Sequence, residues 1–242
     1  MTNHGRVALV TGAAGGIGRA TVAALMRDGY SVTAADVALA DLPCAFEAPL
    51  QQVSTDVTDE AAVARVVSGC VEHFGALDCV VHLAGAVGQG PLVEVDASDW
   101  RRLLEVNLTS AFLLAKASHA ALRSGRGSLV LISSTNGLNG GSALSGPAYA
   151  VAKAGIINLT RYLAKEWGRD GIRVNCVAPG PVDTPMLARL PESTVNSLRQ
   201  SIPLGRLASP EDVAASIAFL CSREAAYLTG TVMNVSGGLV LD

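Results

Sequence analysis

Tyr149 and Lys153 stand four residues apart in the segment Tyr-Ala-Val-Ala-Lys, at the start of a predicted helix. An i, i+4 spacing places both side chains on one helical face, one turn apart. A nearby ammonium favours phenolate over phenol, so we expect Lys153 to lower the pKa of Tyr149 and let it act as an acid or base near neutral pH. The same pair also occurs on ordinary exposed helices, so the surrounding residues must decide between the two interpretations.

Two serines, Ser133 and Ser134, close a predicted strand upstream of this pair. The carboxyl ends of strands in open α/β sheets are where such proteins bind ligands. A hydroxyl at this point could donate a hydrogen bond to a substrate oxygen beside Tyr149. The alternative interpretation is that the two serines only begin a turn.

A glycine-rich turn, Thr-Gly-Ala-Ala-Gly-Gly-Ile-Gly, runs from Thr11 to Gly18 after the first predicted strand. A pyrophosphate needs exposed backbone N–H groups and a helix N-terminus, and a Cβ at the tightest points would block its approach. Between a strand and a helix, such a turn predicts a dinucleotide site. The contacts expected there are Gly12, Gly15, Gly16, Ile17 and Gly18.

Asp36 ends the second predicted strand, beyond this turn. A carboxylate there can accept hydrogen bonds from the adenosine ribose diol and would repel a 2′-phosphate. Arg19 is the one nearby cation and does not outweigh it. The sequence therefore favours NAD(H) over NADP(H), whereas the alternative interpretation is a solvated turn aspartate.

The elements that must position these residues follow the rhythm of a parallel sheet, with short apolar runs alternating with amphipathic segments. Strands are predicted at Arg6–Thr11, Ser31–Asp36, Gln51–Thr55, Asp78–Leu83, Ser128–Ser133, Arg173–Val177 and Thr231–Val235. Helices are predicted at Gly16–Asp28, Thr58–Phe74, Ser98–Val106, Asn107–Arg123, Tyr149–Gly168 and Pro210–Ser222. Thr58, Ser98 and Ser209 are the expected start signals of three of them.

The chain of 242 residues is expected to form one domain, because no linker or repeat divides it. Val37–Leu50 contains two prolines and is expected to be a loop or one short turn. A proline-rich stretch from Pro179 to Arg206 follows a strand end, and residues 183–206 within it are interpreted as a lid over the substrate. The alternative is an ordinary surface excursion.

Composition excludes several classes of protein. Half of the residues are hydrophobic and the net charge is −3, which argues against disorder and against binding to nucleic acid or an anionic membrane. No segment is typical of a secretion signal or a transmembrane helix, and the five scattered cysteines are typical of reduced thiols in the cytoplasm. The four histidines form no metal-ligand pattern, so we expect no metal site.

Taken together, these motifs resemble the short-chain dehydrogenases/reductases. The resemblance rests on the glycine turn, Asn107 in Val-Asn-Leu-Thr-Ser-Ala-Phe, the strand-end serines, Tyr-Ala-Val-Ala-Lys and Pro179-Gly180, and it covers Arg6 to Gly238. It implies a Rossmann-like fold: a doubly wound, seven-stranded parallel sheet with helices on both faces. It also implies a catalytic tetrad of Asn107, Ser134, Tyr149 and Lys153, with Ser134 chosen over Ser133 because it begins the step Ser-Thr-Asn-Gly.

The resemblance assigns a role to each member of the tetrad. Tyr149 would exchange a proton with the substrate oxygen while hydride moves between the carbinol carbon and the nicotinamide. Lys153 would hold the nicotinamide ribose and lower the pKa of Tyr149, and Ser134 would orient the substrate oxygen. Asn107 would sit at a helix irregularity and hold a water that links Lys153 to solvent. An N-cap between two helices is the alternative interpretation of Asn107.

The remaining cofactor contacts are also implied by the resemblance. Those expected, besides Tyr149 and Lys153, are Asp56 and Val57 at the adenine, Ala84 and Gly85 at the adenosine ribose, and Pro179, Gly180, Val182 and Thr184 at the carboxamide. The chain departs from the family where Asn-Asn-Ala-Gly is usual, because it has His82-Leu83-Ala84-Gly85 instead. His82 either replaces the missing asparagine contact or is a satisfied core residue.

These residues predict an NAD(H)-dependent oxidoreductase that acts on a small or medium-sized secondary alcohol/ketone pair. The alternatives are a 3-oxoacyl-ACP or CoA-linked reductase using NAD(P)H, and a non-catalytic dinucleotide-binding scaffold or sensor. Small and apolar residues on more than one face of two long predicted helices indicate a homodimer or homotetramer. Leu138, Leu144, Met186 and Leu187 indicate an apolar substrate pocket without a clear carboxylate anchor. Substrate identity and reaction direction stay open.

Overall fold

Parallel strands form one sheet, with the order β3-β2-β1-β4-β5-β6-β7, in a computed structural model that describes residues 5–38 and 48–241. The strands are β1 (Val7–Thr11), β2 (Ser31–Asp36), β3 (Leu50–Ser54), β4 (Cys79–His82), β5 (Ser128–Ile132), β6 (Arg173–Pro179) and β7 (Val232–Val235). The helices are α1 (Gly16–Arg27), α2 (Glu60–Phe74), α3 (Ala97–Leu104), α4 (Ser110–Gly125), α5 (Thr135–Asn139), α6 (Pro147–Trp167), α7 (Glu192–Ser201) and α8 (Pro210–Cys221).

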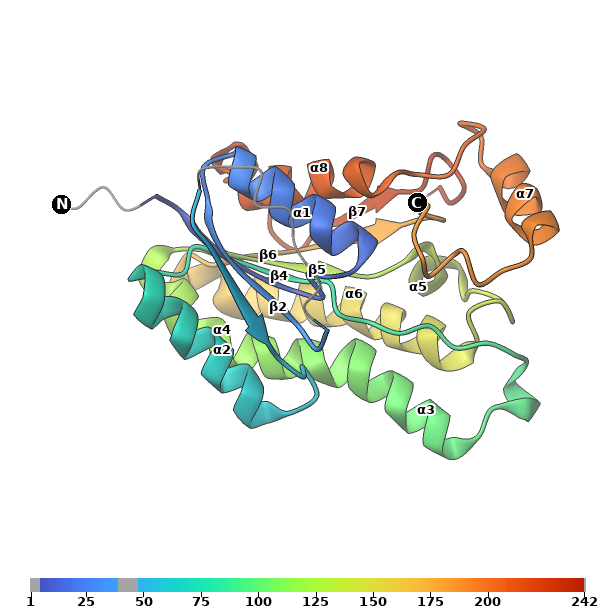
Figure 1. Ribbon diagram of the computed structural model, residues 1–242, viewed down its shortest axis with the longest axis horizontal. Helices are drawn as coiled ribbons and strands as arrows, with labels where there is room; N and C mark the ends of the chain where they lie inside the picture. The colour runs from blue at the N-terminus through green and yellow to red at the C-terminus, as the bar shows by residue number, and fades with distance from the viewer. Residues whose placement is uncertain (1–4, 39–47, 242) are drawn as a thin grey trace.

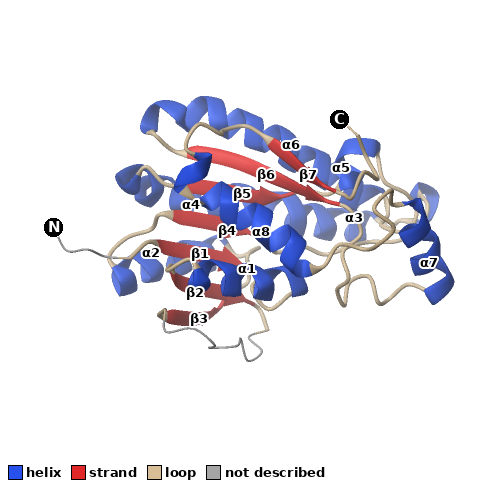
Figure 2. Cartoon of the chain, turned by 90° about the horizontal axis from the view of Figure 1, so that it is seen from above, coloured by secondary structure: helices blue, strands red, loops and turns tan. Residues whose placement is uncertain are grey.

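Helices cover both faces of the sheet (Figures 1 and 2). On one face α1 and α8 pack against each other and the strands, with Leu25 and Ile217 in a shared buried cluster. On the other face lie α2, α4 and α6, whose Val63, Leu114 and Ile156 are buried in a second cluster. β1, β4 and β5 lie between these layers and are buried along their whole length, which explains why their sequences are continuously apolar. The doubly wound, seven-stranded fold is confirmed.

The chain reverses its direction across the sheet between β1 and β4. From β1 it proceeds through β2 to β3 at one edge, and it then returns to place β4 on the other side of β1. Open α/β sheets bind ligands in the crevice outside the carboxyl ends of the strands at such a point. The glycine turn leaves the end of β1, and Ala84 and Gly85 leave the end of β4, so the two segments share this crevice.

The predicted elements match the observed ones within two residues at most ends, but the helix predicted over Asn107–Arg123 is wrong at its start. A π-helical turn, η2 (Glu105–Thr109), joins α3 to α4 without a break, and α4 begins at Ser110. Two of the three start signals are also displaced, to Asp59 for α2 and Asp96 for α3. Ser209 is confirmed as the N-cap of α8, where it forms a capping box with Asp212.

Two short helices were not predicted: α5 after β5, and α7 within the proline-rich stretch. The loop expected over Val37–Leu50 falls mostly on residues 39–47, which lie outside the described residues, and Leu50 itself begins β3. Among the described residues, no helix combines the length and the apolar content needed to cross a membrane.

Candidate active site

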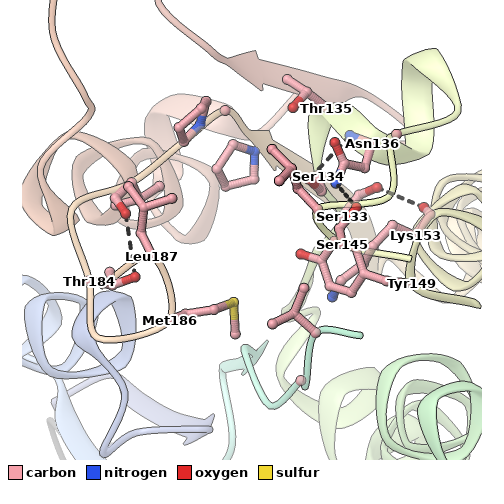
Figure 3. Close-up of a pocket in the computed structure, with 18 of the residues that line it drawn as sticks. Ser133, Ser134, Thr135, Asn136, Ser145, Tyr149, Lys153, Thr184, Met186 and Leu187 are labelled. Atoms are coloured by element: carbon pink, nitrogen blue, oxygen red, sulfur yellow. Dashed lines mark hydrogen bonds between the residues drawn. The ribbon is translucent and has the colours of Figure 1, made fainter. Parts of the chain in front are cut away.

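A cavity of about 380 Å³ opens at the carboxyl ends of β4, β5 and β6. On one side Figure 3 shows Ser134, Tyr149 and Lys153. Met186 and Leu187, from the segment that follows β6, lie on the opposite side. Asn107 and Ile17 also line the cavity. The structure therefore brings the four predicted tetrad residues to one cavity, next to the glycine turn.

Tyr149 lies in the first turn of α6, behind Gly146 and Pro147 at the helix start. Burial raises the pKa of its phenol, while a hydrogen bond with the Ser134 side chain and the charge of Arg189 lower it. The expected net lowering of this pKa by Lys153 is wrong, because burial raises the pKa by more than the lowering effects offset. Desolvation penalises the phenolate, and Lys153 Nζ lies 5.5 Å from the centre of the Tyr149 ring.

Lys153 is buried one turn further along α6, and its Nζ donates a hydrogen bond to the carbonyl of Ile132 at 3.0 Å. Burial also disfavours its charged form and lowers its pKa to about 8. This ammonium thus gives up its proton more readily than an exposed lysine does. The carbonyl at the end of β5 holds it beneath the cavity.

The two strand-end serines have different surroundings. The Ser133 hydroxyl is buried and donates to the Lys153 carbonyl at 2.7 Å, so it ties β5 to α6 (Figure 3). The Ser134 hydroxyl caps α5 by accepting from the Asn136 backbone N–H and lies beside Tyr149. Of the two, only Ser134 is placed to share a substrate oxygen with Tyr149.

Gly137, in the first turn of α5, touches the backbone of α6. A Cβ at this position would lie 2.6 Å from the carbonyl carbon of Lys153 and 2.8 Å from the nitrogen of Ala154. Only glycine allows this approach. Gly137 therefore lets α5, with Ser134 at its N-cap, pack closely against α6, which carries Tyr149 and Lys153.

Asn107 is buried at the centre of the π-helical turn. Its amide nitrogen donates to the carbonyls of Ala86 and Leu103, at 2.8 and 2.9 Å, and its oxygen accepts from the Ala86 N–H at 3.3 Å. The predicted helix irregularity is confirmed, whereas the alternative interpretation of Asn107 as an N-cap is wrong. Its side chain clamps the loop after β4 to the end of α3.

His82, the departure from the family pattern, is a core residue. Its Nδ1 lies 2.7 Å from the Thr11 hydroxyl and its Nε2 lies 2.9 Å from the Ser110 hydroxyl. Because Ser110 donates its own proton to the Val106 carbonyl, Nε2 must carry the hydrogen and Nδ1 must accept from Thr11. Burial lowers the pKa of His82 to about 3, so the ring is neutral. The chain of hydrogen bonds joins β1, β4 and the π-helical turn.

The crevice between β1 and β4 has the form that a dinucleotide requires. Gly12 has a φ of +70°, and a Cβ there would lie 2.4 Å from the backbone nitrogen of Ala84. Asp36 borders the same turn, because its carboxylate accepts from the Ala14 N–H at 3.0 Å. Backbone N–H groups, a helix N-terminus and a carboxylate at the end of β2 beside the turn fit this class of cofactor.

The other expected cofactor contacts differ in their exposure and in the bonds that they already form. Gly85 is exposed beside Asn107, and Thr184 reaches the backbone of Gly16. Gly180, following Pro179, is tied by its N–H to Val235, whereas Val182 is buried. Asp56 is exposed but engaged locally, because two hydrogen bonds from Thr58 lower the pKa of its carboxyl. Val57 packs into the core below it.

Sequence reasoning missed Arg189 as a site residue. It lines the cavity from the turn between Thr184 and Leu190, and its charge acts on Tyr149. No pattern in the sequence distinguishes it from the other arginines of the proline-rich stretch, since only the folded turn brings it there. Within the described ranges, no group of three or more histidine, cysteine or acidic side chains could hold a metal ion.

Comparison with known proteins adds three kinds of similarity. The sequence model of the family described as "Enoyl-(Acyl carrier protein) reductase" matches residues 12–240. The chain is 43% identical to cis-4-hydroxycyclohexanecarboxylate dehydrogenase of Sinomonas cyclohexanicum over 96% of each chain. It is 36% identical to the 3-oxoacyl-[acyl-carrier-protein] reductase FabG of Thermotoga maritima over the full length of both. The crystal structure of levodione reductase superimposes with a TM-score of 0.90, at 32% identity and 96% coverage of each chain.

Proposed function

The chain belongs to the short-chain dehydrogenase/reductase family, oxidoreductases of CH–OH groups that use a nicotinamide dinucleotide, and we propose that it interconverts a secondary alcohol and its ketone with NAD(H). One observation carries the proposal. The Tyr149 phenol lies beside the Ser134 hydroxyl and near Lys153, and it faces a cavity that adjoins the glycine turn after β1. This arrangement has an acid–base group, a hydroxyl and a cofactor cradle in one place.

The cofactor would be held from the adenine end to the nicotinamide end of the crevice. The residues assigned to it are Gly12, Gly15, Gly16, Ile17, Gly18, Asp36, Asp56, Val57, Ala84, Gly85, Pro179, Gly180, Val182 and Thr184, with Tyr149 and Lys153 at the reactive end. When bound, the nicotinamide supplies or accepts the hydride. Gly12 lets the turn pack against the Ala84 backbone at the end of β4, and Asp36 would accept hydrogen bonds from the ribose diol and oppose a 2′-phosphate. Asp36 is the reason for placing NAD(H) before NADP(H).

The four polar residues of the cavity have distinct roles in this proposal. The Tyr149 oxygen takes the hydroxyl proton of the alcohol, or returns it to the ketone oxygen. The Ser134 hydroxyl orients that oxygen and stabilises charge that develops on it. Lys153, with a pKa of about 8, can replace the proton that Tyr149 loses. Asn107 holds the backbone around Ala86, and with it the floor of the cavity.

A 3-oxoacyl thioester reductase is the second candidate, and its support is the full-length similarity to the FabG enzyme. Asp36 opposes it, because the fatty-acid reductase is expected to use NADPH and the carboxylate repels the 2′-phosphate. Wild-type kinetics with each cofactor, on ketones and on 3-oxoacyl thioesters, separate the two candidates. A preference for NADPH together with thioesters would favour the second.

Three further features belong to the same proposal. Residues 183–206 act as a lid over the substrate, which is supported by the position of Met186 and Leu187 against the cavity. The protein forms a homodimer or homotetramer, which is supported by exposed apolar side chains on α4 and α6. Cytoplasmic localisation is supported by the four described cysteines, which are all buried free thiols.

Replacing Tyr149 with phenylalanine tests the proposed chemistry. The variant Tyr149→Phe keeps the ring and its packing but removes the oxygen that moves the proton. We expect NADH binding, followed by fluorescence titration, to persist while kcat falls about 10²- to 10⁴-fold. The matched control is Tyr162→Phe, an exposed position on the same helix.

The two readouts distinguish loss of chemistry from loss of structure. Wild-type turnover in the Tyr149→Phe variant would remove Tyr149 from the mechanism. A failure of the variant to bind NADH would attribute the lost turnover to the cofactor site or to the fold and would count against proton transfer as the role of the phenol.

A further inference from the structure

Arg189 places a guanidinium at the cavity, close enough to Tyr149 for its charge to act on the phenol. It belongs to a tight turn in which the Leu187 and Ala188 N–H groups bond to the Thr184 carbonyl, and Leu190 bonds back to Leu187. The backbone that carries Arg189 is therefore ordered by its own hydrogen bonds. The side chain reaches from this turn to the opposite wall, where it donates to the carbonyl of Leu144.

The charge of Arg189 is not neutralised by the protein. A guanidinium has five N–H donors in a planar fork, and the Leu144 carbonyl is a neutral acceptor that takes one hydrogen bond. In the part of the chain that the structure describes, no carboxylate forms an ion pair with Arg189. Arg189 is exposed to solvent at the edge of the cavity, so the donors that the protein leaves unpaired are open to an anionic group, and the planar fork matches a carboxylate.

The rest of the cavity decides where the anion would lie. Leu144, Met186, Leu187 and Leu190 line the wall around Arg189, so an apolar skeleton fits between the charge and the tetrad. Arg189 also borders a second hollow lined by Glu94, Asp99 and Arg102. Arg102 forms an ion pair with Asp99, which leaves Glu94 as the carboxylate that would repel an anion on that side. The favourable position is thus on the Tyr149 side.

We propose that the substrate is a hydroxy acid, or the corresponding oxo acid, whose carboxylate is bound by Arg189 while its carbinol oxygen lies between Ser134 and Tyr149. The proposal rests on the proposed function and names the substrate class of the same site. The carboxylate and the carbinol are joined by a short apolar skeleton, since both must fit within about 380 Å³. The phosphates of a CoA or carrier-protein thioester are excluded as the anion, because a pantetheine arm separates them from the reacting carbonyl.

Matched pairs of substrates test this assignment. The wild-type enzyme is assayed with 4-hydroxycyclohexanecarboxylate and 3-hydroxybutanoate, and with the methyl ester of each, which keeps the skeleton and removes the charge. The readout is the ratio of kcat/KM for the acid to kcat/KM for its ester. Any effect of Arg189 on the pKa of Tyr149 acts on both members of a pair, so the ratio cancels it.

Two substitutions of Arg189 separate charge from geometry. We expect Arg189→Met to reduce the acid-to-ester ratio about 10- to 100-fold, mainly through the KM of the acid, which corresponds to the loss of hydrogen bonds to a charged group. Arg189→Lys keeps the charge without the fork and should recover part of the ratio. The matched control is Arg65→Met, which removes an exposed arginine of α2 that does not line the cavity.

The outcomes are distinguishable. Equal losses for acids and esters in Arg189→Met, or a wild-type preference for esters, would overturn the carboxylate assignment and leave the proposed function standing. Oxidation of neither acids nor neutral secondary alcohols by the wild type, with NAD⁺ or NADP⁺, would instead reject the proposed function itself.

Discussion

Burial acts on the titratable residues of the site in opposite directions, because it always disfavours the charged form. It raises the pKa of the Tyr149 phenol and lowers that of the Lys153 ammonium to about 8. The spacing of the two residues predicted their common helical face correctly. It could not predict the net shift, since desolvation depends on which atoms surround the residues after folding. The same holds for Arg189, whose effect on Tyr149 arises from a distant turn.

The burial of His82 predicts that the free energy of unfolding decreases at acidic pH. Its pKa is about 3 in the folded protein and close to 6.5 in an unfolded chain, so the unfolded state binds the extra proton first as pH falls. Folding is therefore weakened by up to about 1.4 kcal/mol per pH unit below pH 6.5 on account of this one residue. The variant His82→Asn has no titratable group at this position. At pH 7 its free energy of unfolding should be about 1–3 kcal/mol lower than that of the wild type, because Thr11 and Ser110 lose their hydrogen-bond partner.

Urea unfolding at pH 7, 6 and 5 checks this prediction. The free energy of unfolding of the wild type should approach that of His82→Asn as the pH falls. His73→Asn, at an exposed position on α2, controls for the loss of a histidine from the chain. A difference between wild type and His82→Asn that is constant from pH 7 to 5 would contradict a buried, neutral ring.

Among the elements, those with an apolar face were predicted and those without one were missed. The sequence of α7, Glu-Ser-Thr-Val-Asn-Ser-Leu-Arg-Gln-Ser, has no fully buried residue, and its two apolar residues, Val195 and Leu198, are too few to reveal a helical period. Five-residue α5 contains a glycine and is too short to show a period. The π-helical turn depends on tertiary contacts, because Asn107 and Ser110 bond to the loop after β4 and to His82. Local patterns therefore located the candidate site but not the segments that close it.

Alanine substitutions at two helical glycines, one at the contact between α5 and α6 and one on α2, are expected to have opposite effects on stability. Gly137→Ala forces a Cβ against the Lys153 backbone, so we expect a loss of about 1–3 kcal/mol in unfolding free energy and a lower kcat as Ser134 moves from Tyr149. Gly69→Ala, inside α2, meets no atom within 4 Å and should stabilise by about 0.5–1 kcal/mol. Thermal denaturation and steady-state assays of both variants measure the difference.

Equal behaviour of the two glycine variants would show that α5 can shift away from α6 without cost. Loss of activity in Gly137→Ala at unchanged stability would place the whole effect on the position of Ser134.

At the scale of the whole molecule, the order of apolar and amphipathic segments predicted the layers and the parallel sheet. Such an order leaves few arrangements, because connections between parallel strands are right-handed and helices must cover both faces. The sequence indicated apolar residues on more than one face of two long helices, and the folded structure identifies which of their large apolar side chains stay exposed. Phe112 on α4 is 50% exposed, and Val151 and Tyr162 on α6 are 49% and 62% exposed.

Aspartate substitutions at two of these exposed positions should disrupt the proposed assembly. Phe112→Asp combined with Tyr162→Asp buries two carboxylates if α4 and α6 meet a second copy, so we expect the variant to be monomeric at micromolar concentration. Sedimentation velocity measures the mass of the wild type and of this variant. Val93→Asp, at an exposed apolar residue outside these helices, is the control. A monomeric wild type would reject the assembly.

The packing of α1 against α8 links the beginning of the chain to a segment near its end. Val22 and Leu25 of α1 share one buried cluster with Val213 and Ile217 of α8, and the Tyr30 hydroxyl donates to the Cys221 carbonyl. During translation, α1 leaves the ribosome long before α8 is made. The nascent polypeptide thus carries a bare hydrophobic layer next to its glycine turn until α8 has been synthesised. Premature termination upstream of α8 yields a product that exposes this layer to chaperones, to proteases and to aggregation.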